Sequence, residues 1–240
     1  MKKLLILGGS GFVGNSIIDF AIDKKLIKDN IDQIYILSRT NKSNKKRYKH
    51  IEINYICKNI LDTKKIPEVD YIIYCLKSFN IKTSNKYFNQ FLKLLKTLKK
   101  KPKILFTSSG AVYGKDNTKR KYNEKKAIKI SSINQHNGYK KKYSKEKIFL
   151  EKKFQLLGIK NYMVSIARCY TFIGKDIVNY NYAISDLINS AFAKTSVKLD
   201  TKINVYRSYM HSDDLSKWLI KILKNSTKKC PIYNVGSDEV

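Results

Sequence analysis

The segment Leu4–Gly14, LLILGGSGFVG, constrains the fold of this chain more than any other part of the sequence. Its four leading apolar residues are typical of a strand buried on both faces. Glycines follow at a spacing of three, at Gly8, Gly11 and Gly14. Glycine lets the backbone turn sharply and approach a pyrophosphate, while N–H groups at the start of the next helix attract negative charge. Gly9 completes the dinucleotide-binding pattern G-x-G-x-x-G. The same pattern also suits an ordinary strand-to-helix turn. The rest of the sequence therefore has to distinguish a nucleotide-binding turn from an ordinary one.

Charge is the most unusual property of the composition. The 240 residues include 44 lysines and 5 arginines against 19 acidic residues, a formal net charge of +30. Such an excess suggests a nucleic-acid or anionic-membrane partner. However, the lysines are spread along the chain, and the 31 isoleucines and 20 asparagines point to a bias toward A/T-rich codons. We therefore expect a solvated lysine surface and no nucleic-acid partner.

The sequence contains no apolar run near the roughly 18 residues that a membrane span needs. Lys2 and Lys3 before the first apolar run resemble a secretory signal, but that run is short and leads straight into glycines. No metal ligand set is predicted. The cysteines lie far apart without a C-x-x-C pair, which predicts reduced thiols and a cytoplasmic location, at Cys57, Cys75, Cys169 and Cys230.

Short apolar segments alternate with helical patterns along the first two thirds of the chain. This alternation predicts an α/β fold with a doubly wound parallel sheet, whose ligands bind at the carboxyl ends of the strands. The polar segment 40–50 is expected to be a loop. The expected strands are 4–7, 31–37, 51–56, 69–76 and 102–107, and the expected helices run from near residue 11 to residues 24–25, over 84–99 and over 139–158.

Ser38 and Arg39 follow the second expected strand, where the ribose of a dinucleotide would be recognised. An acidic residue here would bind the 2′-hydroxyl of NAD, whereas serine and arginine suit a 2′-phosphate. The sequence therefore favours NADP over NAD. The alternative for Arg39 is an exposed cation at the end of a strand.

Tyr143 and Lys147 lie one turn apart on the helix expected over 139–158. An ammonium near a phenol favours the phenolate and lowers its pKa, which makes the pair a candidate acid/base. With this composition, chance alone gives about three Tyr-x-x-x-Lys pairs. The other pair is Tyr122 and Lys126, in a polar segment. We select Tyr143 because its helix can pack beside the sheet.

Six motifs in this order resemble the extended short-chain dehydrogenase/reductase family, in its nucleotide-sugar epimerase/dehydratase branch. The resemblance implies a Rossmann fold, an NAD(P) cofactor and a nucleotide-sugar substrate for surface polysaccharide. It covers the chain from Gly8 to Gly236. The motifs are the glycine turn, 108-SSGAVYG-114, 143-YSKEKIFLE-151, 168-RCYTFIG-174, 207-RSYMHSDD-214 and 233-YNVG-236.

The resemblance also implies roles for individual residues. Tyr143 would exchange a proton with a sugar hydroxyl, Ser109 would hydrogen-bond the same oxygen, and Lys147 would tune Tyr143 and hold the nicotinamide ribose. Asn59 and Ile60 would lie against adenine, although Asn59 replaces the usual aspartate. The other implied cofactor contacts are Phe12, Val13 and Leu76 beside the glycine turn, and the implied substrate contacts are Ser109, Tyr143, Thr171 and Arg207.

Departures from the family pattern narrow the expected reaction. Gly110 and Ala111 stand where 4,6-dehydratases carry Asp-Glu for eliminating water. This leaves a 4-epimerase or a keto-sugar reductase; the alternative is a non-catalytic NAD(P)-binding regulatory or structural member. Thr171 replaces a common substrate-contacting asparagine. For Arg168 and Arg207, the alternative role is pairing with nearby carboxylates such as those at 213–214.

The resemblance divides the chain into a dinucleotide-binding Rossmann domain, 1–168, and a mainly substrate-binding part, 169–240. In the second part we expect helices over 183–194 and 213–223, with Trp218 in the core, and an extended segment over 203–206. The helix over 213–223 and a strand over 231–235 would return to the Rossmann core. The chain ends earlier than the family pattern, as a truncated sequence would. A homodimer is compatible with the resemblance.

Overall fold

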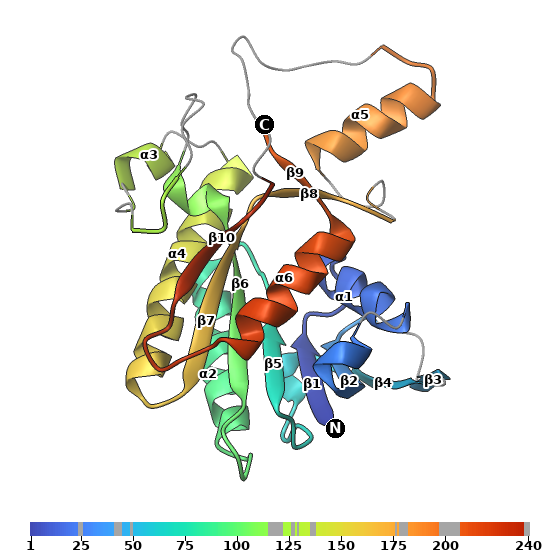
Figure 1. The fold of residues 1–240 in the computed structure, drawn as a ribbon. Coiled ribbons are helices and arrows are strands. Elements are labelled where there is room, and N and C mark those ends of the chain that lie inside the picture. Colours follow the sequence, from blue (N-terminus) through green and yellow to red (C-terminus); the bar gives the residue numbers. More distant parts are fainter. Residues whose placement is uncertain are drawn as a thin grey trace.

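The computed structural model describes residues 1–23, 26–40, 45–48, 50–114, 122–125, 128, 130–134, 138–175, 177, 182–196 and 207–237. Its main sheet consists of strands β1 (Lys2–Leu7), β2 (Ile31–Ser38), β3 (Lys45–Tyr48), β4 (Ile51–Cys57), β5 (Tyr71–Tyr74), β6 (Lys103–Ser109), β7 (Met163–Cys169) and β10 (Ile232–Val235). They lie in the order β10-β7-β6-β5-β1-β2-β4-β3 (Figure 1). Every neighbouring pair is parallel except β3 with β4. The predicted doubly wound parallel sheet is confirmed.

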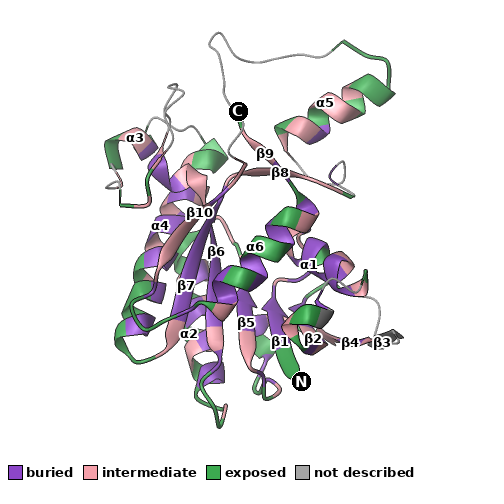
Figure 2. Cartoon of the chain, viewed as in Figure 1, coloured by how far each residue is buried: buried purple, intermediate pink, exposed green. Residues whose placement is uncertain are grey.

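Helices cover both faces of the sheet (Figure 1). One face packs on α1 (Phe12–Ile22) and α6 (Ser212–Lys224), and the other on α2 (Ile81–Leu95) and α4 (Gly138–Ile159). Alternate residues of β1 point to opposite faces, so Leu4 and Ile6 join the first cluster and Leu5 and Leu7 the second. All four are fully buried, which explains why the strand reads as a continuous apolar run (Figure 2).

The remaining elements lie around the carboxyl edge of the sheet. Strands β8 (Thr171–Ile173) and β9 (Tyr209–His211) form a separate parallel pair. Helix α5 (Ala183–Phe192) lies beyond that pair, and α3 (Ile130–Asn134) lies near the amino end of α4 (Figure 1). The main sheet and this upper layer together position the site.

Two strands differ from the sequence-based expectation. Lys45–Tyr48 forms β3, in a segment expected to be a loop, because it pairs with β4 through backbone hydrogen bonds at the edge of the sheet. Edge strands are often polar and lysine-rich, so they lack the apolar period that reveals a buried strand. Strand β7 was not among the expected strands, since Ser165 and Arg168 interrupt its apolar run.

The carboxy-terminal elements follow the expected order, with one wrong assignment. Strand β10 pairs with β7 at the edge of the main sheet. Trp218 was expected in the core but is 46% exposed, with Lys221 Nζ 5.0 Å from its ring centroid. The apolar face of α6 instead comprises Leu215, Leu219 and Ile222. The expected extended segment 203–206 lies outside the described residues, and the division at residue 168 stays a prediction.

No helix within the described ranges combines the length and apolar character needed to cross a bilayer.

Candidate functional site

A cavity opens at the carboxyl ends of β1, β5, β6 and β7, between the glycine turn and α4. Residues far apart in the sequence meet there, since parallel strands bring their carboxyl ends to the same edge. The predicted site residues that line it are Gly8, Gly11, Phe12, Val13, Gly14, Ser109, Tyr143 and Lys147.

The glycine turn is built for close backbone approach. Gly8 has φ +84°, a conformation that favours glycine, and its N–H donates to Leu37 O at 2.9 Å. At Gly14 a Cβ would lie 2.4 Å from Gly9 Cα, so only glycine permits this contact between turn and helix. Gly11 caps α1 without a side-chain hydrogen bond.

The first turn of α1 therefore supplies backbone N–H groups and the positive helix end on the cavity side. A pyrophosphate fits this chemistry, because no acidic side chain lies in the first turn of α1. The residues present thus suit the diphosphate of a dinucleotide.

Lys147 lies on the inner face of α4 and is only 3% exposed. Its Nζ donates to Thr107 O at 2.8 Å and lies 5.5 Å from the centroid of the Tyr143 ring. Burial lowers the pKa of Lys147, because the ammonium loses hydration there. Glu146 acts in the opposite direction and favours the charged form.

Tyr143 differs from the expectation in its ionisation. Burial raises the pKa of its hydroxyl, and a hydrogen bond with Ser109 only partly opposes this. Lys147 is not among the groups that shift this pKa, so the expected lowering by its ammonium is not found, and burial favours the protonated hydroxyl. The Lys147 ammonium is directed to the Thr107 carbonyl of β6 instead.

The remaining predicted cofactor residues lie outside the lining of this cavity. Ser38 is buried at the end of β2, and Arg39 next to it is exposed. They directly follow Leu37, which accepts the hydrogen bond from Gly8. Asn59 caps a short turn by accepting from Leu61 N at 3.1 Å. The other two, Ile60 and Leu76, pack in the core cluster under α2 and α4.

Neither additional substrate residue reaches the cavity lining. Thr171 begins β8 and pairs with Tyr209 of β9, where it is half-buried. Arg207 is exposed shortly before β9. They lie in the upper layer, beyond the carboxyl edge.

Several lining residues were not assigned by the sequence. Cys75 follows β5, Thr107 lies near the end of β6 and Cys169 ends β7, so their position at the carboxyl edge was a usable signal. Tyr139 lies one turn before Tyr143 on α4, and the two rings stack with centroids 6.4 Å apart. Lys77 and Ser108 follow or end expected strands at the same edge, whereas no role was predicted for Tyr170, Phe172 and Tyr182.

Arg168 has a structural partner behind the cavity. Its Nε and Nη2 donate to Glu151 at 3.0 and 2.7 Å, and its Nη1 donates to Tyr113 Oη at 2.8 Å. The alternative of pairing with Asp213 or Asp214 is therefore wrong for Arg168, because β7 faces α4 at this point. The Arg168–Glu151 pair, together with Tyr113, therefore links β7, α4 and the turn after β6.

A doubly wound parallel sheet with a glycine turn after its first strand is the architecture of a Rossmann-type α/β protein. The sequence matches the NAD dependent epimerase/dehydratase family over residues 4–236. The chain belongs to this family.

Solved structures share the fold at low sequence identity. UDP-N-acetylglucosamine 4-epimerase from Bacillus cereus is 17% identical, with a TM-score of 0.67 over 99% of this chain and 79% of that one. The enzyme of that name from Methanobrevibacter ruminantium is 20% identical, with a TM-score of 0.71 and coverages of 98% and 76%. dTDP-glucose 4,6-dehydratase from Bacillus anthracis, in complex with NAD, is 14% identical, with a TM-score of 0.70 and coverages of 100% and 76%. A comparison with curated protein sequences finds no match.

Proposed function

We propose that this protein is an NAD(P)-dependent enzyme that acts on a nucleotide sugar, as a 4-epimerase or a keto-sugar reductase. The observation that carries the proposal is the meeting of Ser109, Tyr143 and Lys147 with the glycine turn in one cavity. A protein that only senses a cofactor has no need for a buried acid/base pair there.

In the proposed reaction a nicotinamide cofactor supplies or accepts the hydride. Tyr143 holds its proton in this structure, so it is ready to donate to a carbonyl oxygen as a keto-sugar is reduced. In the opposite direction its phenolate takes the proton of the sugar hydroxyl. Ser109 hydrogen-bonds the same oxygen, and Lys147 would hold the nicotinamide ribose.

The surroundings of Gly110 support this choice over a 4,6-dehydratase. A Cβ at Gly110 would lie 2.8 Å from Cε1 of Tyr170, so the tyrosine ring occupies the space that a larger side chain would need. The aspartate that dehydratases carry at this position would require the Tyr170 ring to shift. The absence of a carboxylate and the filled space both favour chemistry that needs no elimination.

The finer assignments extend this proposal. Ser38 and Arg39 favour NADP, and Asn59 and Ile60 stay candidates for the adenine contact. Thr171 and Arg207 stay candidates for the substrate, with Arg207 suited to a diphosphate through its guanidinium fork. The four thiols are unpaired, which supports the cytoplasm as the compartment. Polysaccharide synthesis and a homodimer belong to the same proposal.

Tyr143→Phe tests the proposal directly. The change removes the hydroxyl that transfers the proton, so we expect turnover to fall by at least about 100-fold while NADP(H) still binds. Turnover is measured by absorbance of the reduced cofactor and binding by its fluorescence.

Tyr122→Phe is the matched control, because Tyr122 belongs to the other Tyr-x-x-x-Lys pair and lies outside the cavity lining. We expect it to keep activity. Turnover that survives Tyr143→Phe contradicts the assignment. The substrate is identified by mass spectrometry of ligands that copurify, followed by incubation with UDP-, dTDP- and GDP-sugars.

A further inference from the structure

Glu146 is a fully buried carboxylate on α4 that the proposed chemistry does not use. Its Oε1 accepts from Ser78 N at 2.8 Å and its Oε2 from Phe79 N at 2.8 Å. The Ser84 hydroxyl also donates to Oε1. The Ser78 hydroxyl is a fourth donor, 3.4 Å from Oε1, and together these hydrogen bonds fasten the segment between β5 and α2 onto α4.

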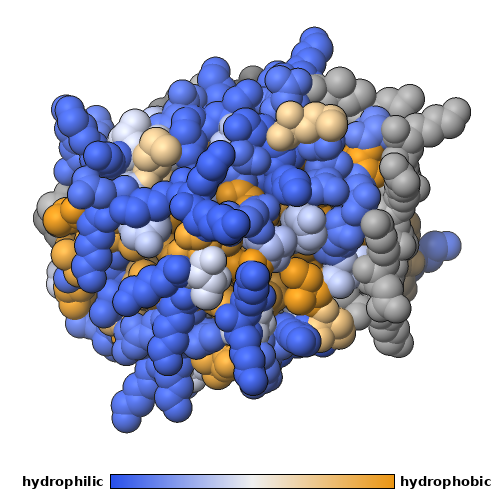
Figure 3. Space-filling view, turned by 90° about the horizontal axis from the view of Figure 1, so that it is seen from below, coloured by the Kyte–Doolittle hydropathy of each residue, from blue (hydrophilic) through white to orange (hydrophobic). Residues whose placement is uncertain are grey.

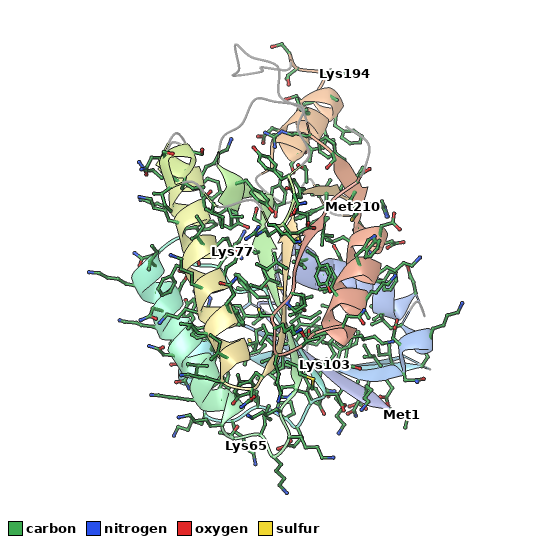
Figure 4. All side chains as sticks on the ribbon, turned by 60° about the vertical axis from the view of Figure 1, so that its left-hand side comes forward. Met1, Lys65, Lys77, Lys103, Lys194 and Met210 are labelled. Carbon is green, nitrogen blue, oxygen red and sulfur yellow. The ribbon has the colours of Figure 1, made fainter. Side chains whose placement is uncertain are left out.

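This contact lies between the groups that line the cavity. Lys77 directly precedes Ser78 and lies beside α4 (Figure 4), and Lys147 directly follows Glu146. The Phe79 ring lies 5.7 Å from the Tyr143 ring, centroid to centroid. Because Glu146 holds the Phe79 backbone, it also holds that ring against Tyr143.

The charge of Glu146 matters to Lys147. The groups that act on the Lys147 ammonium are Glu146 on the same helix, Lys77 and Cys75 after β5, and Cys169 at the end of β7. Burial raises the pKa of Cys75 to about 11 and that of Cys169 to about 12, so both thiols are neutral at pH 7. Glu146 is then the anion that opposes the desolvation of Lys147.

We propose that Glu146 is a positioning residue, which fixes the 77–79 segment against α4 and supplies the negative charge beside Lys147. This inference rests on the proposed function for its kinetic consequence. Its geometric consequence can be tested without activity, because hydrogen exchange at the Ser78 and Phe79 amides requires no turnover.

Glu146→Gln removes the charge and faces one backbone N–H with an amide NH₂, so one of the two bonds is lost. We expect hydrogen exchange to accelerate by about tenfold or more at whichever of the Ser78 and Phe79 amides loses its acceptor, measured by mass spectrometry or NMR on the full chain. Without the anion the pKa of Lys147 falls further. The basic limb of the kcat profile therefore moves to lower pH, since Lys147 now loses its proton earlier.

Ser84→Ala is the matched control, because it removes one donor to Glu146 and keeps the carboxylate. We expect its basic limb to stay at the wild-type pH and the two amides to stay protected. If Glu146→Gln fails to fold, Glu146→Asp keeps the charge but is one carbon shorter. In Glu146→Asp we expect faster exchange at one or both of the Ser78 and Phe79 amides, and a basic limb of the kcat profile at the wild-type pH.

Unchanged exchange at both amides in the Glu146 variants overturns the inference, and so does an unshifted basic limb in Glu146→Gln. A failure of the proposed function gives a different result from a failure of the Glu146 inference. In that case Tyr143→Phe retains turnover, while the exchange result for Glu146→Gln still reports on the contact.

Discussion

At the scale of single residues, the proposed preference for NADP depends most on Arg39. It is one of only five arginines, it is exposed, and it follows the strand whose end bonds to the glycine turn. A guanidinium at this place can bind a 2′-phosphate through two hydrogen bonds, whereas the 2′-hydroxyl of NAD offers no charge to pair. Ser38 beside it is buried, and its Oγ lies 3.4 Å from Thr40 N.

Arg39→Ala is expected to weaken NADPH binding about tenfold or more and to change NADH binding little, because only NADPH carries the 2′-phosphate. Fluorescence titration of the two cofactors measures both affinities. Lys28→Ala removes the same charge at the amino end of β2 and serves as the control. Equal losses for NADPH and NADH in Arg39→Ala would refute the phosphate role.

At the scale of elements, α4 joins the chemistry to the core. Its amino-terminal half carries Tyr143 and Lys147 in the cavity lining and the fully buried Glu146, and Glu151 one turn further pairs with Arg168 of β7. Both members of that pair are nearly fully buried, at 4% and 3% side-chain exposure. The pair sets how the helix lies on the sheet, because its bidentate geometry allows little sliding.

Glu151→Ala leaves the Arg168 guanidinium buried without its carboxylate. We expect the free energy of unfolding to fall by about 3–5 kcal/mol, measured by urea denaturation. Asp29→Asn is the comparison, since the Lys224–Asp29 pair has a similar N···O distance of 2.8 Å but is partly exposed. It should have a much smaller effect. A similar loss of unfolding free energy in the two variants would show that the buried Arg168–Glu151 pair stabilises the fold no more than the partly exposed pair.

At the scale of the whole molecule, the excess of lysine is a property of the surface. Hydrophilic side chains cover much of the face at the amino ends of the strands, with apolar patches between them (Figure 3). The net charge of +30 still creates a long-range positive potential. Any nucleic acid held by this potential is bound through phosphates alone.

Nucleic acid retained on nitrocellulose at low salt is therefore expected to be released as salt rises toward about 0.2 M, since lysine contacts are lost as counterions return. The measurement is a filter-binding series with unrelated DNA and RNA sequences. Retention that persists at this salt, or that differs between sequences, would point to a specific nucleic-acid function.

The sequence by itself determined the layers of the fold. Local signals sufficed there, because a strand buried on both faces must be apolar and a turn at a pyrophosphate must be glycine. The segment Leu4–Gly14 became β1, the turn and α1 as predicted. Strand β3 and the orientation of Trp218 were not predictable in this way, since backbone pairing at a sheet edge and rotation of a helix leave little trace in local apolarity.

Only the tertiary structure decided what surrounds the candidate site. The spacing of Tyr143 and Lys147 placed them on one side of a helix, but their ionisation depends on burial, which spacing does not measure. The contact of Glu146 with Ser78 and Phe79 joins residues 67 and 68 positions apart. Such contacts form only when strands and helices pack. The sequence therefore selected the glycine turn and the candidate pair Tyr143 and Lys147, and folding set the charge and position of the groups around them.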